Sequence, residues 1–303
     1  GPSDENEHAV LNVIAHPTFV LAGKTVDATE ITPALLRDTL HEADGIEANV
    51  ATGYHAIEFL LWGQDLNGTG PGAGDRPWTD YARGADCTGG NCDRRAAYLS
   101  AATDLLVADL REMAEAWGPG GAARAAVTQD PQAGLRAMLT GMGSLSYGEL
   151  AGERMKLGLM LGDPEEEHDC FSDNTHMSHW LDGIGIRNVY LGRYERPDGS
   201  VVAGPSLSDL VAAADPAVDE RLRAELDASV AALAAIKARA EGGMAYDQML
   251  DPANAEGHAL ILAAIEALVM QTRSIERAVT ALGLGQIVVE GSDSLDNPQA
   301  VFQ

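Results

Sequence analysis

The chain has 303 residues, of which 46% are hydrophobic and 22% are charged, so it holds enough apolar material for packed cores. Twenty basic residues against 46 acidic ones give a formal net charge of −26 at pH 7. Because this surplus repels phosphate backbones and anionic headgroups, composition argues against nucleic-acid and membrane-surface partners. An integral membrane protein is not expected either, since Glu266 interrupts the apolar stretch 259–270.

Apolar residues recur at helical spacing along most of the chain. The segments that carry this pattern are long and rich in alanine and leucine, and they span residues 36–40, 48–62, 96–117, 135–161, 207–214, 218–240 and 259–282. Alternating β-branched patterns are confined to short pieces around Val201 and Ile287. The sequence therefore predicts an all-α fold, and its length favours two domains.

Glycine and proline clusters divide the predicted helices into groups. Residues 67–77 carry four glycines and two prolines, residues 118–121 form another break, and Gly162-Asp163-Pro164 ends the helix that contains Met155. We predict a boundary near Gly162, with residues 1–162 forming a first antiparallel helical bundle and residues 163–303 a second one packed beside it. Sites in such folds lie on inward faces or in the cleft between bundles.

Two of the three cysteines flank a tight glycine turn, Cys87-Thr88-Gly89-Gly90-Asn91-Cys92. This spacing predicts a local disulfide and an oxidising compartment. A zinc knuckle would need two more ligands, and none is adjacent in the sequence. Cys170 is interpreted as a small buried hydrophobe rather than a nucleophile. The opening Gly1-Pro2-Ser3 reads as an expression remnant, so the absence of an export signal or a lipid-anchor cysteine here gives no information on the compartment.

The first candidate site is Gly53-Tyr54-His55-Ala56-Ile57-Glu58, within a predicted helix. His55 and Glu58 are three residues apart, so they share one helix face and can bind one ion together. The pattern alone is weak, because the same spacing also gives a plain intrahelical hydrogen bond. A glycine-rich loop follows and leads to Arg76-Pro77-Trp78-Thr79-Asp80-Tyr81.

A second block, residues 167–176, reads EHDCFSDNTH and is followed by GIRNVYLG over residues 185–192. Its oxygen and imidazole groups at near-helical spacing belong to Ser172, Asp173, His176, His179 and Asp182. These residues either complete a metal or ligand site that faces His55, or form a buried network in which Ser172 or Asp173 caps a helix. Asp173 and His176 are the preferred candidates, because residues i and i+3 share a face.

Two other sets of residues are explained by surface charge or by packing, without a functional site. Glu165-Glu166-Glu167-His168 has the ExxH spacing of a di-iron centre, but its place in an acidic turn after a proline favours plain surface charge. The aromatic residues near the motif are expected to be packing groups first, namely Tyr54, Trp62, Trp78 and Tyr147.

The two ordered blocks resemble the imelysin family, also described as M75 peptidases and iron-regulated proteins, whose signature is GxHxxE followed by a loop and an Arg-Pro pair. The resemblance runs from about Ile31 to Leu210, whereas residues 4–29 do not match it clearly. It implies an exported bacterial protein, periplasmic or anchored to the outer membrane, with two helical bundles and a link to iron acquisition. His55 and Glu58 would be the central pair near the interface between bundles, with Arg76 close by.

The leading hypothesis is an exported, non-enzymatic protein that binds a metal ion or a small iron-related ligand at the GxHxxE site, in iron uptake or homeostasis. Iron is the first candidate and zinc the second. A metallopeptidase of the M75 type is the second hypothesis, with Glu58 as ligand or general base, although His41-Glu42 lacks the second histidine of a zincin and Phe59 breaks the inverted HxxEH form. The third is a scaffold without metal that binds a polypeptide, or an exported redox or transport protein.

Overall fold

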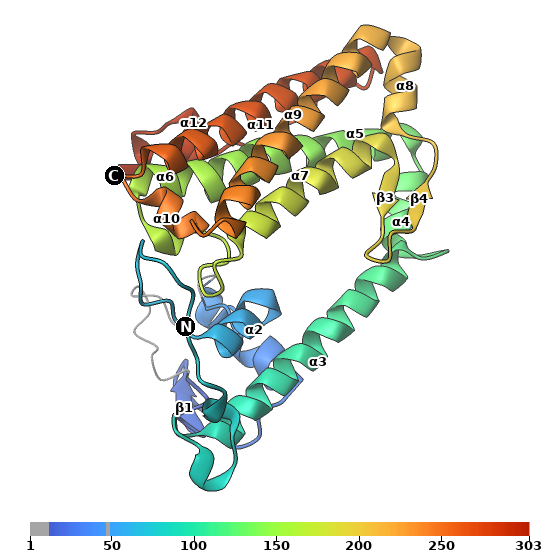
Figure 1. Ribbon diagram of the computed structural model, residues 1–303. Helices are drawn as coiled ribbons and strands as arrows, with labels where there is room; N and C mark the ends of the chain where they lie inside the picture. Colours follow the sequence, from blue (N-terminus) through green and yellow to red (C-terminus); the bar gives the residue numbers. More distant parts are fainter. Residues whose placement is uncertain (1–11, 47–48, 303) are drawn as a thin grey trace. The chain divides into compact units, whose positions relative to one another are not determined.

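The computed structural model describes residues 12–46 and 49–302, and within them the chain is mostly helical (Figure 1). The all-α prediction is confirmed. Two short antiparallel hairpins interrupt it, β1 (Thr18–Leu21) with β2 (Lys24–Asp27) and β3 (Arg193–Glu195) with β4 (Val201–Ala203). The extended pattern around Ile287 forms no strand in the part of the chain that the structure describes. Gly1-Pro2-Ser3 and Ala48 lie outside the described residues.

The chain folds into two compact units. Unit 1 comprises residues 1–66 and 73–121, and unit 2 comprises residues 67–72 and 122–303. The division therefore falls at Gly121, whereas the sequence placed it near Gly162. Gly162 does end a helix, in a left-handed conformation. The helices before it nevertheless belong to unit 2, because they pack against the long helix α11 (Ala255–Ala281).

Unit 1 is built around two helices, α2 (Gly53–Trp62) and α3 (Cys92–Trp117), which pack on each other. Its core contains Leu36, Ala102 and Leu105. The remaining elements are short: β1, β2, α1 (Pro33–Leu35), η2 (Leu36–Leu40), η3 (Ala43–Gly45), η4 (Trp78–Tyr81) and η5 (Gly84–Asp86). Among its described residues, only α2 and α3 reach ten residues, so unit 1 is smaller than the bundle that the sequence predicted.

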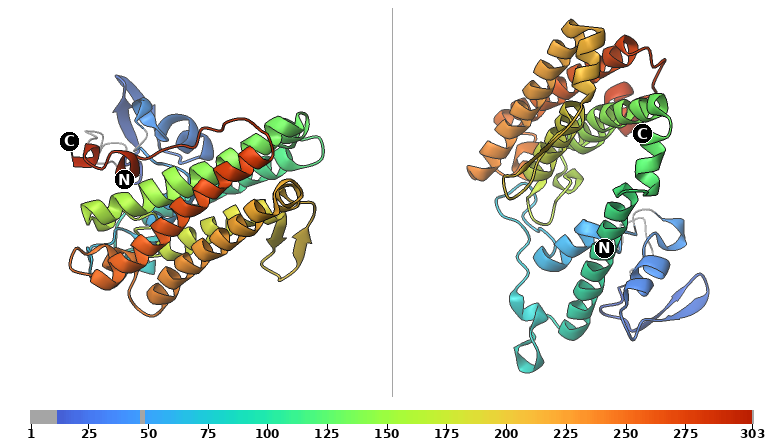
Figure 2. Two further views of the ribbon diagram at one scale, coloured as in Figure 1. Left: turned by 90° about the horizontal axis from the view of Figure 1, so that it is seen from above. Right: turned by 90° about the vertical axis from the view of Figure 1, so that its right-hand side faces the viewer.

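Unit 2 holds the larger core. A continuous helical run consists of α5 (Pro131–Ser144), the π-helical η6 (Leu145–Lys156) and α6 (Leu157–Leu161). Figure 2 shows α11 beside α9 (Pro216–Glu241) and beside η6. The other elements are α4 (Ala122–Thr128), η7 (Pro164–Glu166), α7 (Thr175–Leu191), α8 (Leu207–Ala214), α10 (Tyr246–Leu250), α12 (Asp293–Asp296) and η8 (Ala300–Phe302). Two apolar clusters run along it, one around Leu139 and Ile275 and the other around Met155 and Leu268.

Helix α11 is long and apolar enough, by length and composition, to cross a membrane. A core helix meets the same criteria. Ile261, Leu268 and Ile275 of α11 are fully buried, in the two clusters that hold unit 2 together. The packing of these side chains accounts for the hydropathy of the helix.

Candidate functional site

The GxHxxE motif lies at the start of α2 in unit 1. The helix begins at Gly53, whose φ of 83° is one that other residues rarely adopt, and it ends at Gly63. His55 Nδ1 and Glu58 Oε2 are 2.9 Å apart, one helical turn along the same face. Glu58 is buried, with 8% of its surface exposed, whereas the His55 side chain is 37% exposed. The predicted pairing of the two residues is therefore present.

This hydrogen bond defines how the pair can bind an ion. A metal-binding histidine commonly uses one ring nitrogen for the metal and the other for a carboxylate that fixes the ring. With Nδ1 held by Glu58, the Nε2 edge of His55 is the edge that can face an ion. In the same geometry Glu58 has two possible roles. It can bind the ion through its second carboxylate oxygen, or it can serve only to orient the His55 ring.

Arg76 binds the C-terminal half of α2. Its Nη2 donates to the Phe59 carbonyl at 3.3 Å, and its guanidinium carbon lies 5.4 Å from the centre of the Phe59 ring. Its Nη1 donates to Asp80 Oδ2 at 3.1 Å. Arg76 was predicted to line the site, and these contacts make it an anchor between the loop and the residue that follows Glu58.

Asp80 is a residue that the sequence analysis did not single out as part of the site. It is buried between Arg76 and Arg95, whose Nη1 lies 3.9 Å from its carboxylate. A Cβ at Gly89 would collide with this carboxylate, which explains a glycine there. The Cys87–Cys92 disulfide closes the same turn. The spacing of Arg76 and Asp80, four residues apart, was the available signal.

Several aromatic side chains near the motif are exposed. Tyr54 on α2 and Trp78 on η4 are 65% and 75% exposed, and Trp62 at the end of α2 is also exposed. The expectation that these three are packing groups is wrong. The helix is only ten residues long, so one face packs on α3 while the other stays open.

In unit 2 the second block forms a loop and the start of α7. Helix α7 begins at Thr175 after Asn174, with no side-chain cap, so neither Ser172 nor Asp173 has the predicted capping role. Instead the Thr175 hydroxyl accepts a hydrogen bond from the Asp169 backbone at 2.8 Å. Asp173 adopts a left-handed φ of 54° and turns the chain into the helix.

The i, i+3 pair of this block does not repeat the geometry of the first motif. His176 Nδ1 lies 3.1 Å from the backbone carbonyl of Asp173 rather than from its carboxylate. Burial lowers the pKa of His176. Further along α7, Asp182 accepts a hydrogen bond from Arg154 at 3.0 Å, and burial raises the pKa of the Asp182 carboxyl despite this partner.

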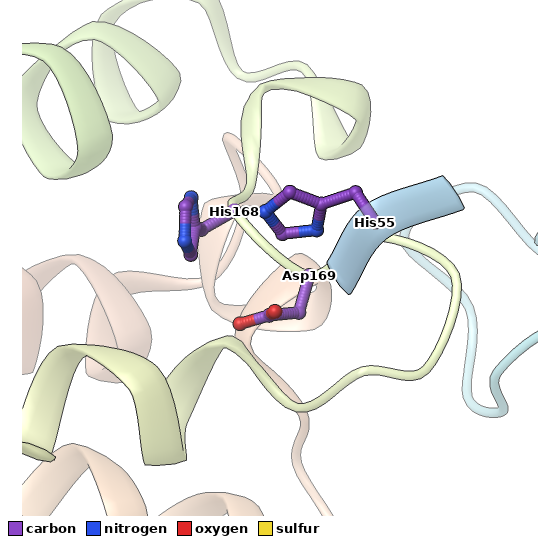
Figure 3. Close-up of side chains that lie close together, drawn as sticks. All are labelled: His55, His168 and Asp169. Atoms are coloured by element: carbon purple, nitrogen blue, oxygen red, sulfur yellow. The ribbon is translucent and has the colours of Figure 1, made fainter. Parts of the chain in front are cut away.

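His168 and Asp169 are consecutive residues of the same loop, and both offer metal-ligand atoms. Figure 3 shows them on the loop ahead of α7, together with the His55 side chain on α2. His168 Nε2 lies 3.3 Å from Arg154, and the His168 ring stacks on that of His179 with 6.4 Å between ring centres. Cys170 beside them is half-buried.

Glu167 opens this block and is buried, with 5% of its surface exposed, so its interpretation as surface charge is wrong. Burial, and next the charge of Asp247, raise the pKa of Glu167 to about 9. Carboxylate oxygens of Glu167, Asp173 and Asp247 lie within 4.8 Å of one another. Asp247, on α10, was missed because it lies 74 residues beyond Asp173 and 80 beyond Glu167, where sequence spacing gives no signal of proximity.

The protein is thus a mostly helical one, with a hydrogen-bonded histidine–glutamate pair on its GxHxxE helix and, in its second unit, three carboxylates close enough to hold a metal ion. The family model described as Imelysin (Peptidase_M75) matches residues 1–275, so the chain belongs to the imelysin family. The match is longer than the predicted range of 31–210 and includes residues 4–29, which had not been recognised. A comparison with curated proteins found no match.

Proposed function

We propose that the protein binds a metal ion, with iron as the first candidate and zinc as the second, through the GxHxxE pair, and that it serves iron uptake or homeostasis outside the cytoplasm. The observation that supports the proposal is the 2.9 Å hydrogen bond between His55 Nδ1 and Glu58 Oε2. A buried carboxylate that orients a partly exposed imidazole is the outer-shell arrangement found behind metal-binding histidines.

The chemistry of the pair favours a transition metal. Mixed imidazole and carboxylate ligands suit iron, manganese and zinc, whereas calcium and magnesium prefer oxygen ligands alone. Two donors do not complete a coordination shell. Water, a small iron-related ligand or further residues of the chain would supply the remainder. We also propose that the protein is exported. The Cys87–Cys92 disulfide supports an oxidising compartment.

Metal analysis tests the proposal directly. Protein purified without chelator, and then loaded anaerobically with Fe²⁺ or with Zn²⁺, should retain a transition metal after desalting. His55→Ala should lose that metal, and Glu58→Ala should lose most of it. His16→Ala is the matched control, because His16 is an exposed histidine of the same unit. Full metal content in both site variants would overturn the assignment.

Substrate cleavage separates binding from catalysis. A metallopeptidase would cleave an unfolded protein, chelator would abolish the cleavage, and Glu58→Gln would slow it by at least about a hundredfold. A binding protein should give no chelator-sensitive cleavage while still retaining the metal. Failure to retain Fe²⁺ when it is the only metal supplied would remove iron from the proposal.

A further inference from the structure

Three carboxylates converge inside unit 2, and none of them belongs to the GxHxxE helix of unit 1. Glu167 follows η7, Asp173 lies in the loop before α7, and Asp247 belongs to α10, which packs against η7. One oxygen from each lies within 4.8 Å of the other two. All three residues belong to a single compact unit. Their grouping is therefore a property of that unit's own core.

The burial of this group distinguishes it from an acidic surface patch. Asp247 is fully buried and Glu167 is 5% exposed. Like charges at this distance in a low-dielectric interior repel strongly, so the group needs protons or a cation to be stable. One oxygen of Glu167, Oε2, has no hydrogen-bond partner among the described residues.

A second observation comes from Tyr246, the neighbour of Asp247 on α10. Tyr246 is fully buried, and its hydroxyl has no hydrogen-bond partner within residues 12–46 and 49–302. The phenol lies near enough to the cluster for the charge of Glu167 to act on it. A tyrosine hydroxyl buried in a core usually finds a partner, so an orphaned one beside carboxylates indicates a missing ligand.

His179 is a further buried polar group, next to Tyr246. It is fully buried, and neither of its ring nitrogens has a hydrogen-bond partner in the described part of the chain. Its ring meets the Tyr246 ring edge to face, with 5.0 Å between the ring centres. Tyr246 and the histidine packed on it are thus two adjacent buried side chains whose polar atoms have no partner among the described residues.

We infer that Glu167, Asp173 and Asp247 bind a hard divalent cation in the core of unit 2, and that the Tyr246 hydroxyl faces it. Oxygen ligands alone select calcium, magnesium or manganese over softer ions. The site is distinct from the GxHxxE pair and does not rest on the function proposed for that pair. It would hold the loop that carries the second sequence block against α10.

Titration of the full chain with Ca²⁺, Mg²⁺ and Mn²⁺, after chelator treatment and dialysis, tests the inference. The His55→Ala variant is used as the background, so that loss of the first site cannot be mistaken for loss of the second. Calorimetry should show one site for at least one of these ions. Asp247→Asn and Glu167→Gln should each raise its dissociation constant by at least about tenfold.

Glu165→Gln is the matched control, because Glu165 is an exposed carboxylate two residues from Glu167, and it should bind as the parent does. Tyr246→Phe provides a milder variant in case a carboxylate variant fails to fold, and it should weaken binding severalfold. Two results would overturn the inference: no binding of any of the three ions at millimolar concentration, or binding that Asp247→Asn, Glu167→Gln and Tyr246→Phe all leave unchanged.

Discussion

The two groups of candidate metal-ligand residues differ in their burial and in the charges that surround their carboxylates. In unit 1 a buried glutamate is hydrogen-bonded to a histidine whose side chain is 37% exposed. In unit 2 two carboxylates, Glu167 and Asp247, are almost wholly buried and a third, Asp173, lies beside them. The first group pairs a carboxylate with an imidazole that water can reach, whereas the second brings three carboxylates together, two of them buried.

This difference implies different roles. An ion bound at the partly exposed imidazole of the first group would exchange readily, as the proposed handling of iron requires. An ion bound in the largely buried cluster, as inferred above, would exchange more slowly and would contribute to folding. Ligand chemistry points the same way, because imidazole suits transition metals and carboxylates suit hard cations.

The largest effect should come from removing the buried anion that organises the loop next to α2. Asp80→Ala leaves Arg76 and Arg95 buried without their shared partner, and breaking a buried ion pair costs about 3–5 kcal/mol. Urea unfolding should show this loss, and metal retention at His55 should fall with it. Asp75→Ala, at an exposed carboxylate of the same loop, should change the free energy of unfolding by under about 0.5 kcal/mol.

The cation affinity of unit 2 shows whether Asp80→Ala affects the GxHxxE site alone or both groups of ligand residues. If the two groups are independent, Asp80→Ala leaves the calcium, magnesium or manganese affinity of the cluster unchanged. Loss of metal binding at both groups in this variant would mean that the two groups are not independent. A cost below about 1 kcal/mol would mean that Asp80 is not the anchor of the loop.

Glu58→Gln should have the next largest effect. Glutamine keeps the size of the side chain but removes the charge that orients and polarises His55, and such outer-shell changes lower metal affinity about 10- to 100-fold. Competition with a chelating dye measures the change for Zn²⁺ and Fe²⁺. His16→Ala should bind both ions as the parent does. An unaltered affinity in Glu58→Gln would show that the hydrogen bond is structural only.

These two predictions involve residues that the sequence revealed to different degrees. His55 and Glu58 were found because residues three apart on a helix share a face, which is a local rule. The all-α fold was found for the same reason, since helical periodicity is local. Asp80 has a local partner in Arg76, but its second partner Arg95 lies fifteen residues away, beyond a turn that the sequence alone does not fold, so its burial between them was not predicted.

The cluster of Glu167, Asp173 and Asp247 could not be predicted from the sequence, because its members come together only through tertiary packing. Glu167 stands in an acidic turn after a proline, where exposure is the usual outcome, and only its packing against α10 buries it. The boundary near Gly162 was misplaced by the same kind of cause. A glycine that ends a helix marks a turn, whereas a domain boundary depends on which helices share a core.

Reduction of the disulfide should have a smaller, local effect. The Cys87–Cys92 bond closes a loop of six residues, for which chain entropy predicts about 2 kcal/mol. Cys170→Ser should serve as the background, so that the reductant acts on the disulfide alone. Calorimetry should show a lower melting temperature for unit 1 with reductant. An equal shift in unit 2, or no shift at all, would contradict the assignment of this bond to the loop around Asp80.

The smallest expected effect concerns two buried tyrosines of unit 2, and comparing their phenylalanine variants tests the cation site most specifically. The Tyr190 hydroxyl donates to Asp219 at 2.8 Å, whereas that of Tyr246 has no partner within the described residues. Tyr190→Phe should destabilise the chelated protein by about 1–2 kcal/mol, since it removes one of the two hydroxyl donors of a buried carboxylate and leaves only Ser208. Tyr246→Phe should be neutral or stabilise the chelated protein by up to about 1 kcal/mol, because it removes a hydroxyl that has nothing to bind.

Saturating cation should reverse the sign for Tyr246→Phe alone. If the hydroxyl faces a bound ion, the parent gains more stability from the ion than this variant does, and the difference appears as a smaller rise in melting temperature. Tyr190→Phe should gain as much as the parent, because Asp219 lies on α9 and outside the cluster. Equal gains in all three proteins would mean that Tyr246 does not face the ion, whereas equal destabilisation in both chelated variants would mean that its hydroxyl is satisfied without one.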